Sequence, residues 1–529
     1  MKNLKSALKS LPMVIAVLFL FSCQVQDASK KVRPFELDEI TIPEIRQAYK
    51  DGKYTIHQIV QLYLDRIEEI DRNGPKLNSI IIVNTEALQV ADSLDKVMAA
   101  GGNHGQMFGI PVVLKDNINT HDKMPTTAGS RVLKNSYPDQ DSFVAKKLRE
   151  AGAVILAKAN LSEWANYRAS FSSSGWSGVG GQTNNPYVLD RNPCGSSSGS
   201  AVAVSANLCA VAVGTETWGS IMCPSNANGI VGIKPTVGLW SRSGIVPISY
   251  TQDTAGPMAR TVTDAAILLG AVTGVDSTDG KTLASAGNSL SDYSKFLNKN
   301  GLQGKRIGYL KTKEGVDFKM DTLIHRAVRF MKSQGAEIIE LKKIVEGKPS
   351  KNSEVVMAFE FKDGLQKYFA SLGEDAPVKN LEEVIAATLG DSIEMRYFDV
   401  GVMENSQTKG GLDSYEYKKA VRDMLLAYRD DGIDRAMDEH NLDAIISPTG
   451  GPAWKTDLIN GDNFMMSTTV NAALSGYPNI NVPMGFIGDV PVGISFFGRA
   501  WSEPVLIEIA YAYEQGTKHR KAPEFLETD

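Results

Sequence analysis

The pattern of apolar and polar positions predicts helices and strands in alternation. Residues 108–116 form a short apolar run bounded by turn formers, which predicts a buried strand that ends near Lys115. Upstream, apolar residues recur every three or four positions, as in an amphipathic helix with Thr55 as its N-cap: Ile56, Ile59, Val60, Tyr63, Leu64, Ile67 and Ile70.

The middle of the chain continues this alternation. It predicts a helix near residues 142–151, strands at 153–157 and 209–214, and a helix at 200–206. The stretch 170–200 is rich in Ser, Gly and Asn, so it could be a flexible linker. Aromatic residues in and around it favour an ordered, packed loop instead: Trp164, Tyr167, Phe171, Trp176 and Tyr187.

Charged residues become more frequent between residues 302 and 440, where amphipathic helices such as 323–334 and 415–438 should cover the core. Strand-like runs then return at three places: 444–447, 480–482 and 492–497. Strands and helices in this order indicate an α/β fold. No linker divides the interior, so the 529 residues can form one large domain.

The balance of charge limits the classes of ligand. The net charge is −5, and acidic and basic residues are interspersed along the chain. Nucleic-acid-binding proteins need a basic stripe, and membrane-surface proteins need a polybasic patch. The sequence has neither, so we expect a small neutral or mixed substrate and no nucleic acid.

The N-terminal segment resembles a bacterial lipoprotein signal. Three lysines precede an apolar run at 11–21, which is too short to span a membrane, and Cys23 follows. We therefore expect a signal peptide at 1–22, lipidation of Cys23, a tether at 23–35 and one folded domain at 36–527. The protein would lie in the cell envelope, attached to a membrane only through this lipid. The alternative is a plain secretory signal cleaved at another position.

The other cysteines are Cys194, Cys209 and Cys223, an odd number in one segment. We expect them to be small buried packing residues and do not expect disulfides, although Cys194 could be sensitive to oxidation. Their spacing from each other and from the six histidines fits no metal site, so we expect no metal.

Two serines in a nearly uncharged stretch carry the candidate chemistry. Ser196 lies in a Gly/Ser run, and Ser220 follows twenty-four residues later in a Thr-Glu-Thr-Trp-Gly-Ser turn. A serine hydroxyl needs a base to become a nucleophile, and the histidines lie in polar or amphipathic surroundings. A buried lysine can be neutral and act as the base, which makes Lys115 a candidate. Taken alone, Lys115 could equally be a strand-end lysine that reaches solvent, and the Gly/Ser run could be a linker or a phosphate-binding loop.

Several segments in one order resemble the amidase signature family, and within it the bacterial peptide amidases. The resemblance covers nearly the whole chain after the predicted signal. The matching segments are 109–118 (GIPVVLKDNI), 160–166 (NLSEWAN), 180–183 (GGQT), 195–200 (GSSSGS), 214–217 (GTET), 252–258 (QDTAGPM), 476–478 (GYP) and 491–493 (PVG).

The resemblance implies a single α/β domain with a large mixed β-sheet covered by helices. It also implies hydrolysis of a carboxamide to an acid and ammonia without a cofactor. Ser220 would be the nucleophile and Lys115 the base, and Ser196 would relay the proton between them. The peptide bond between Gly195 and Ser196 would be cis. Backbone N–H groups of Thr217, Trp218 and Gly219 would form the oxyanion hole. Asn166 and Ser197 are expected to bind the substrate.

Trp218 departs from the family, in which this position is usually glycine, or acidic in peptide amidases. A tryptophan should fill space beside the pocket and alter substrate shape. Two alternatives to a self-sufficient amidase stay open: an impaired amide-binding lipoprotein with the same fold, and an amidotransferase A-like subunit. For the self-sufficient enzyme we expect no obligatory protein partner.

Overall fold

The computed structural model describes residues 34–102, 104–374 and 376–528. The predicted signal peptide and Cys23 lie outside these residues, as does most of the predicted tether. From Pro34 onward the described chain folds as one unit. Within it, every helix is too short or too polar to span a lipid bilayer.

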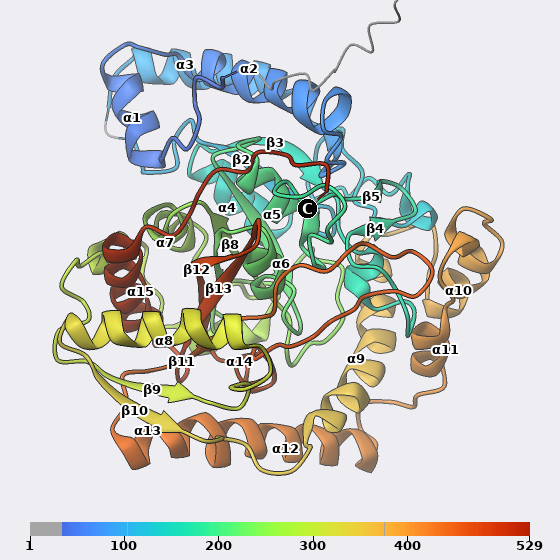
Figure 1. Cartoon of the computed structure of the whole chain (residues 1–529). Helices are drawn as coiled ribbons and strands as arrows, with labels where there is room; N and C mark the ends of the chain where they lie inside the picture. The colour runs from blue at the N-terminus through green and yellow to red at the C-terminus, as the bar shows by residue number, and fades with distance from the viewer. Residues whose placement is uncertain (1–33, 103, 375, 529) are drawn as a thin grey trace, which may run out of the picture. The chain divides into compact units, whose positions relative to one another are not determined.

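One mixed sheet of eleven strands forms the centre of the fold (Figure 1). The strands lie side by side in this order: β1 (Ile80–Val83), β3 (Val154–Ala159), β2 (Pro111–Lys115), β6 (Val211–Glu216), β8 (Thr254–Ala259), β7 (Val231–Lys234), β12 (Asn479–Ile487), β13 (Val490–Phe497), β11 (Ala444–Pro448), β9 (Arg306–Leu310) and β10 (Glu337–Leu341). A separate hairpin pairs β4 (Trp176–Ser177) with β5 (Gly181–Gln182).

The strands that carry the candidate chemistry lie inside this sheet. Strand β2 pairs in parallel with β3 and β6, and β6 pairs antiparallel with β8. All residues of β2, β3 and β6 are buried, because both faces of the sheet are covered. Such strands consist of continuous apolar runs rather than alternating ones, which explains why the sequence revealed them. The predicted α/β fold with a large mixed sheet is confirmed.

Helices surround the central strands of the sheet (Figure 1). Thr55 caps α2 as predicted, with its side chain accepting the N–H of Gln58. The α-helices are α1 (Ile42–Lys50), α2 (Ile56–Arg66), α3 (Ala87–Ala99), α4 (Phe143–Glu150), α5 (Ser198–Ser205), α6 (Met222–Ala227), α7 (Val262–Ala271), α8 (Phe318–Ser333), α9 (Ser350–Ser371), α10 (Leu381–Leu389), α11 (Gly401–Gln407), α12 (Tyr415–Tyr428), α13 (Arg435–His440), α14 (Val470–Ser475) and α15 (Glu503–Thr517).

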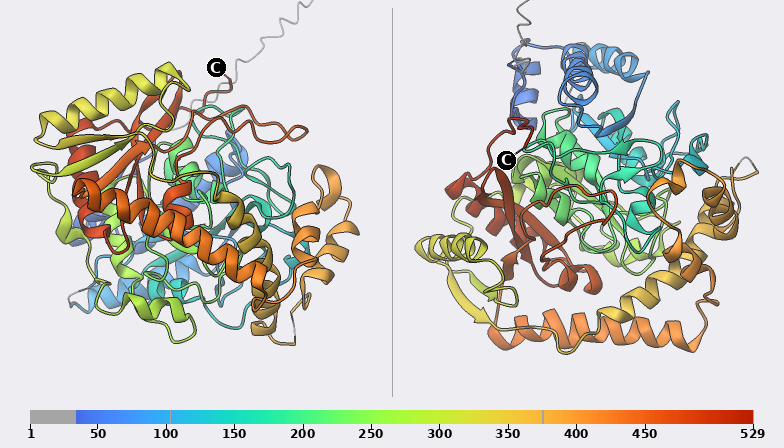
Figure 2. Two further views of the ribbon diagram at one scale, coloured as in Figure 1. Left: turned by 90° about the horizontal axis from the view of Figure 1, so that it is seen from below. Right: turned by 45° about the vertical axis from the view of Figure 1, so that its right-hand side comes forward.

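The region 302–440 is more varied than its sequence pattern indicated. Its helices α9 to α12 run along the outside of the fold in each view of Figures 1 and 2. The region also supplies β9 and β10, which close one edge of the sheet and were not predicted. The helix predicted over 415–438 is interrupted: a π-helical turn, Arg429–Asp434, separates α12 from α13. This turn contains Gly432, a residue that weakens a regular helix.

Helix α5 differs from the outer helices because all of its residues are buried. It consists of small residues, which lets it lie close to β6 and β2. The loop before it carries Ser196, and β6 leads into the turn that carries Ser220. The packing of α5 against these two strands therefore brings together parts of the chain that are distant in sequence.

Candidate active site

Lys115 ends β2 with no exposed surface, so the alternative of a solvent-reaching lysine is excluded. Its Nζ donates to Ser196 Oγ at 2.7 Å and to Thr215 Oγ1 at 2.8 Å. It also lies 3.1 Å from Ser197 Oγ and 3.2 Å from the Thr215 carbonyl oxygen. Burial lowers the pKa of Lys115 well below its usual value, and the charges of Asp253 and Glu216 only partly oppose this.

Ser197 has a different position from the one expected. Its hydroxyl donates to the carbonyl oxygen of Thr215 at 2.9 Å and accepts the Thr215 N–H at 3.1 Å, besides its contact with Lys115. The side chain is fully buried beneath the loop. Ser197 therefore joins the loop to β6 and helps to hold Lys115, while its contact with substrate stays a prediction.

Ser196 lies between this lysine and the second serine segment. The Gly195–Ser196 peptide bond is cis, as the resemblance implied. Residue 195 has to be small, because a Cβ there would lie 2.2 Å from Ser162 Oγ. The next N–H in the chain, that of Ser197, donates to the Ser220 carbonyl oxygen at 3.1 Å. The two serine-bearing segments are thus direct neighbours.

The turn that carries Ser220 is held by the carboxylate of Glu216. Its Oε2 accepts the N–H groups of Ile221 at 2.8 Å and Met222 at 3.0 Å, which fixes the turn to the start of α6. Gly219 has φ +82°, a conformation that favours glycine, and a Cβ there would lie 3.0 Å from Thr469 Oγ1. Ser220 retains a small exposed fraction of 8%. Glu216 was not among the predicted site residues.

The turn offers free hydrogen-bond donors. Among the described residues, no hydrogen bond uses the backbone N–H of Trp218, Gly219 or Ser220. Preorganised N–H groups of this kind can stabilise an oxyanion that forms on a substrate carbonyl. Two of the three predicted donors, Trp218 and Gly219, are therefore free, Ser220 offers another, and the role of Thr217, Trp218 and Gly219 as an oxyanion hole stays a prediction.

A buried carboxylate below the turn fixes Thr217. Its Oγ1 donates to Asp253 Oδ1 at 2.5 Å, and Asp253 Oδ2 accepts the N–H groups of Ile248 and Ser249. Burial raises the pKa of Asp253 to about 6, against the effect of these hydrogen bonds. Asp253 lies in the segment 252–258 that supported the family resemblance, but the sequence alone assigned it no role.

Trp218 fills space beside the turn. It is half-buried and packs against apolar residues of α9, α12 and α14: Val356, Ala420, Met424, Tyr428, Ala473 and Leu474. It also contacts the apolar cluster that contains Phe361 and Met357 of α9. Its side chain therefore joins the turn to the outer helices.

Asn166 is exposed on a left-handed turn. Trp164, Ala165 and Asn166 have φ of 52°, 53° and 69°. Non-glycine residues rarely adopt this conformation, and such backbone often occurs at functional sites. Ser172 Oγ donates to Asn166 Oδ1 at 2.8 Å. The structure thus gives Asn166 an unusual and accessible position, while its contact with substrate stays a prediction.

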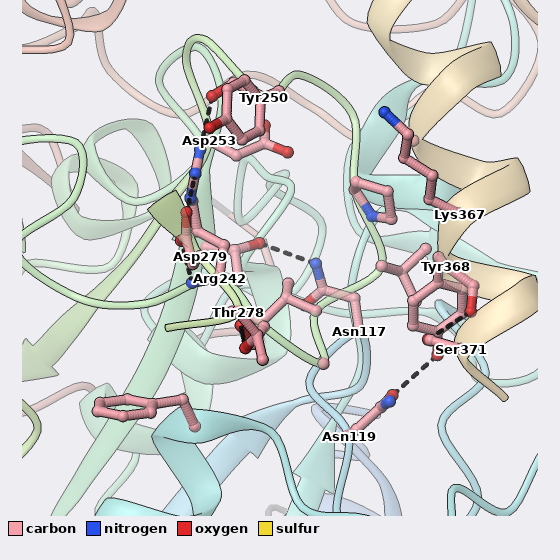
Figure 3. A pocket seen from close by; sticks show the side chains of 18 of the residues that line it. Asn117, Asn119, Arg242, Tyr250, Asp253, Thr278, Asp279, Lys367, Tyr368 and Ser371 are labelled. Carbon is pink, nitrogen blue, oxygen red and sulfur yellow. Dashed lines mark hydrogen bonds and ion pairs between the residues drawn. The ribbon is translucent and has the colours of Figure 1, made fainter. Parts of the chain in front are cut away.

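A cavity of about 700 Å³ lies on the Thr217 side of the site, between the loop 242–254 and α9. Its inner wall includes Asn117, Thr215 and Thr217, and Asn117 Nδ2 donates to Thr215 Oγ1 at 3.0 Å. Figure 3 shows Tyr368 and Lys367 of α9 across from Arg242 and Tyr250. Other carboxylates and cations line the outer part, so the cavity is polar as well as large.

One prediction about the cysteines is wrong. Cys194 and Cys223 form a disulfide, with their Cα atoms 5.9 Å apart. The prediction failed because the odd number of cysteines hid a pair that only the packing of the serine loop against α6 brings together. Cys209 is buried and unpaired, as expected of a packing residue.

The chain is similar to known proteins over most of its length. The Amidase family model matches residues 58–507. The structure is similar to that of native peptide amidase from Stenotrophomonas maltophilia, with 44% identity, a TM-score of 0.90, and coverage of 93% of this chain and 100% of that one. The sequence is 41% identical to a probable amidase of Arabidopsis thaliana over 93% of each chain. It is 35% identical to the A-type subunit of glutamyl-tRNA(Gln) amidotransferase from Microcystis aeruginosa, covering 92% of this chain and 99% of that protein.

Proposed function

Because the chain belongs to the amidase signature family and is an amide-hydrolysing enzyme, we propose that it removes the carboxamide nitrogen from C-terminally amidated peptides. Small aryl or alkyl amides are the second substrate class. The observation that carries the proposal is the position of Lys115, buried against Ser196 next to the Ser220 turn. The peptide preference rests on the similarity to peptide amidase.

In the proposed reaction, R–CO–NH₂ and water give R–COOH and NH₃. Ser220 Oγ attacks the amide carbon while its proton passes through Ser196 to neutral Lys115. The oxyanion accepts hydrogen bonds from the turn at Thr217, Trp218 and Gly219. The C–N bond breaks as the proton returns to the departing nitrogen, which leaves an ester on Ser220. A water molecule then attacks the ester carbonyl carbon, its proton passes along the same relay and on to Ser220 Oγ, and the acid R–COOH is released.

An amidotransferase A-like subunit is the second candidate, and the similarity to that type of protein over almost its full length supports it. Such a protein would pass ammonia to a partner. We favour the free-standing amidase because the identity to peptide amidase is higher. Release of ammonia by the purified chain alone separates the two.

An impaired amide-binding protein is the third candidate, since Trp218 lies within the proposed oxyanion hole. The backbone N–H of a tryptophan is as good a donor as that of glycine, and no described residue occupies it. We therefore propose that the protein is active and that the side chain of Trp218 shapes the substrate site.

We also propose that the protein is attached to a membrane of the cell envelope through lipidated Cys23. The Cys194–Cys223 disulfide supports an oxidising compartment, since such bonds are rare in the cytosol. Labelling of cells with a fatty-acid probe, followed by capture of the protein, tests this. The label should be absent from a Cys23→Ser variant, and equal labelling of both forms would contradict the proposal.

Ammonia release from a panel of amidated peptides and simple amides tests the reaction. The wild type should release ammonia from peptide amides, and Ser220→Ala should lower kcat/KM by roughly 10⁴-fold or more. Cys209→Ala is a matched buried control that should leave the rate unchanged. Equal rates for the wild type and Ser220→Ala would refute the mechanism.

A further inference from the structure

The Cys194–Cys223 disulfide joins the two segments that carry the candidate serines. Cys194 is two residues before Ser196, and Cys223 is three residues after Ser220, in the first turn of α6. The bond therefore crosses from one serine-bearing segment to the other within a few residues of each hydroxyl.

The backbone of each cysteine is hydrogen-bonded to residues close to its serine. The N–H of Cys194 donates to Asn192 Oδ1 at 2.7 Å, and Ser198 Oγ donates to the Cys194 carbonyl oxygen at 2.6 Å. On the other segment, the N–H of Cys223 donates to the Gly219 carbonyl oxygen at 2.8 Å. A displacement of either cysteine would thus be transmitted to the peptide units around Ser196 or Ser220.

The disulfide is the covalent link among several interactions that join the two segments and their immediate neighbours. Between the described residues 194–198 and 217–223, the hydrogen bond from the Ser197 N–H to the Ser220 carbonyl oxygen is the one other polar link. It lies on the opposite side of Ser196 from Cys194. The disulfide and this bond together bracket Ser196. Just outside these ranges, Ser197 Oγ bonds to Thr215, and Asn228 Nδ2 donates to the Pro193 carbonyl oxygen at 2.8 Å.

The disulfide is buried in a small apolar cluster. Cys194 is 4% exposed and Cys223 is 7% exposed. The cluster is drawn from separate parts of the chain: Tyr187, Val188, Ala227, Ala453 and Val490. These neighbours should keep the surroundings folded when the bond is absent, so that loss of the bond affects the serines more than the whole fold.

We propose that this disulfide is a positioning cross-link for catalysis, which holds Ser196 in line with Ser220 and makes full activity conditional on an oxidised state. The proposal rests on the proposed function of the two serines. A dithiol reverses the state by exchange: its thiolates attack the S–S bond, two cysteine thiols form, and the dithiol is oxidised to a cyclic disulfide. Newly made chain in a reducing compartment would accordingly be poorly active until it is oxidised.

The test compares the Cys194→Ala/Cys223→Ala double variant with the wild type and with Cys209→Ala. Measurements are kcat, KM, the pH dependence of kcat and the thermal unfolding midpoint, with an amidated dipeptide as substrate. At a temperature where all forms are folded, kcat of the double variant should fall about 100-fold, as expected for a misplaced catalytic group. KM should change less than kcat, and Cys209→Ala should match the wild type.

A lower unfolding midpoint with unchanged kcat would overturn the proposal, because the bond would then only stabilise the fold. Should the double variant fail to fold, wild-type protein is treated with dithiothreitol and its free thiols are counted. Activity should fall as two further thiols appear and should return on reoxidation, whereas full activity with both thiols free would overturn the proposal. The Ser220→Ala variant is assayed in parallel: if it is active, the proposed function fails, whatever the disulfide does.

Discussion

Two buried lysines on neighbouring strands make an instructive comparison. Lys115 ends β2 and Lys158 lies in β3, where it is paired in register with Leu114. Both are fully buried, and burial lowers the pKa of both. By burial alone, either could be the neutral lysine that a serine hydrolase of this type needs.

Their neighbours distinguish them. Lys158 Nζ donates to the Ile118 carbonyl oxygen at 2.6 Å and to Thr126 Oγ1 at 2.9 Å, and the charge of nearby Asp116 favours its protonated form. Lys115 instead contacts several hydroxyl groups, including that of Ser196. Both lysines thus contact a carbonyl oxygen and at least one hydroxyl group. The difference is that one hydroxyl beside Lys115 belongs to Ser196, which lies next to the Ser220 turn, and a hydroxyl can pass a proton on. The groups around a buried lysine, rather than its burial, therefore indicate a base.

The largest expected effect separates the two lysines directly. Lys115→Met should lower kcat/KM for an amidated peptide by roughly 10⁴-fold, because no base remains to accept the Ser220 proton. Lys158→Met should keep most of kcat and lower the free energy of unfolding by about 3 kcal/mol, since Asp116 loses its countercharge. Ammonia assays and urea unfolding measure both. Similar losses of activity in the two folded variants would contradict the claim that Lys115, and not Lys158, is the base.

The pH dependence of kcat gives a second test of the difference between Lys115 and Lys158. Only neutral Lys115 can take a proton, so kcat should fall as the pH drops below the lowered pKa of Lys115. The decline should appear at a pH far below the usual lysine value of 10.5. A Lys158→Met variant should show the same decline at the same pH. A wild-type profile without this decline at low pH would show that Lys115 is not the titrating base. A decline that moves to another pH in Lys158→Met would point to Lys158 instead.

A smaller effect concerns stability. A lysine with a lowered pKa in the folded state binds fewer protons there than in the unfolded state. Stability should therefore rise with pH from the lowered pKa up to the usual value of about 10.5. The rise should be weaker in Lys115→Met and in Lys158→Met than in the wild type, as measured by thermal unfolding above neutral pH. An unchanged slope in either variant would show that this lysine is protonated in the folded protein.

The smallest effect is expected at Trp218, which lies outside both lysine sites. Trp218→Gly removes packing against α9 and α12 but keeps the backbone N–H, so kcat should change little. KM values across a panel of peptide amides should shift by about three- to tenfold, most for bulky side chains. A collapse of kcat for all substrates would assign Trp218 to the chemistry rather than to substrate shape.

The sequence predicted the parts of the site that lie in characteristic motifs. The strand ending at Lys115, the loop of Ser196 and the turn of Ser220 have distinctive local patterns, and the structure brings them together. Residues that act through long-range contacts were missed. Glu216 and Asp253 appear in the matched segments, but only the fold shows that they hold the turn. The disulfide was missed for the same reason, since cysteine spacing does not reveal which loops are adjacent.

Ser197 shows that a place in a motif does not reveal whether a side chain is buried. Its place in the Gly/Ser run made it a plausible substrate contact, whereas the packing of α5 against β6 buries its hydroxyl completely. Strand pairing likewise explains why β9 and β10 escaped prediction. They are short segments on either side of the amphipathic helix α8, and their strand character comes from joining the edge of a sheet whose other strands lie far away in sequence.

The most direct test of the central claim is the rate at which a serine-directed fluorophosphonate labels the protein, with the labelled residue identified by peptide mass spectrometry. We predict that the label lies on Ser220, that Lys115→Met slows labelling at least 100-fold, and that Lys158→Met labels at nearly the wild-type rate. Labelling on another residue, or equal rates in the two lysine variants, would contradict the claim that Lys115 activates Ser220.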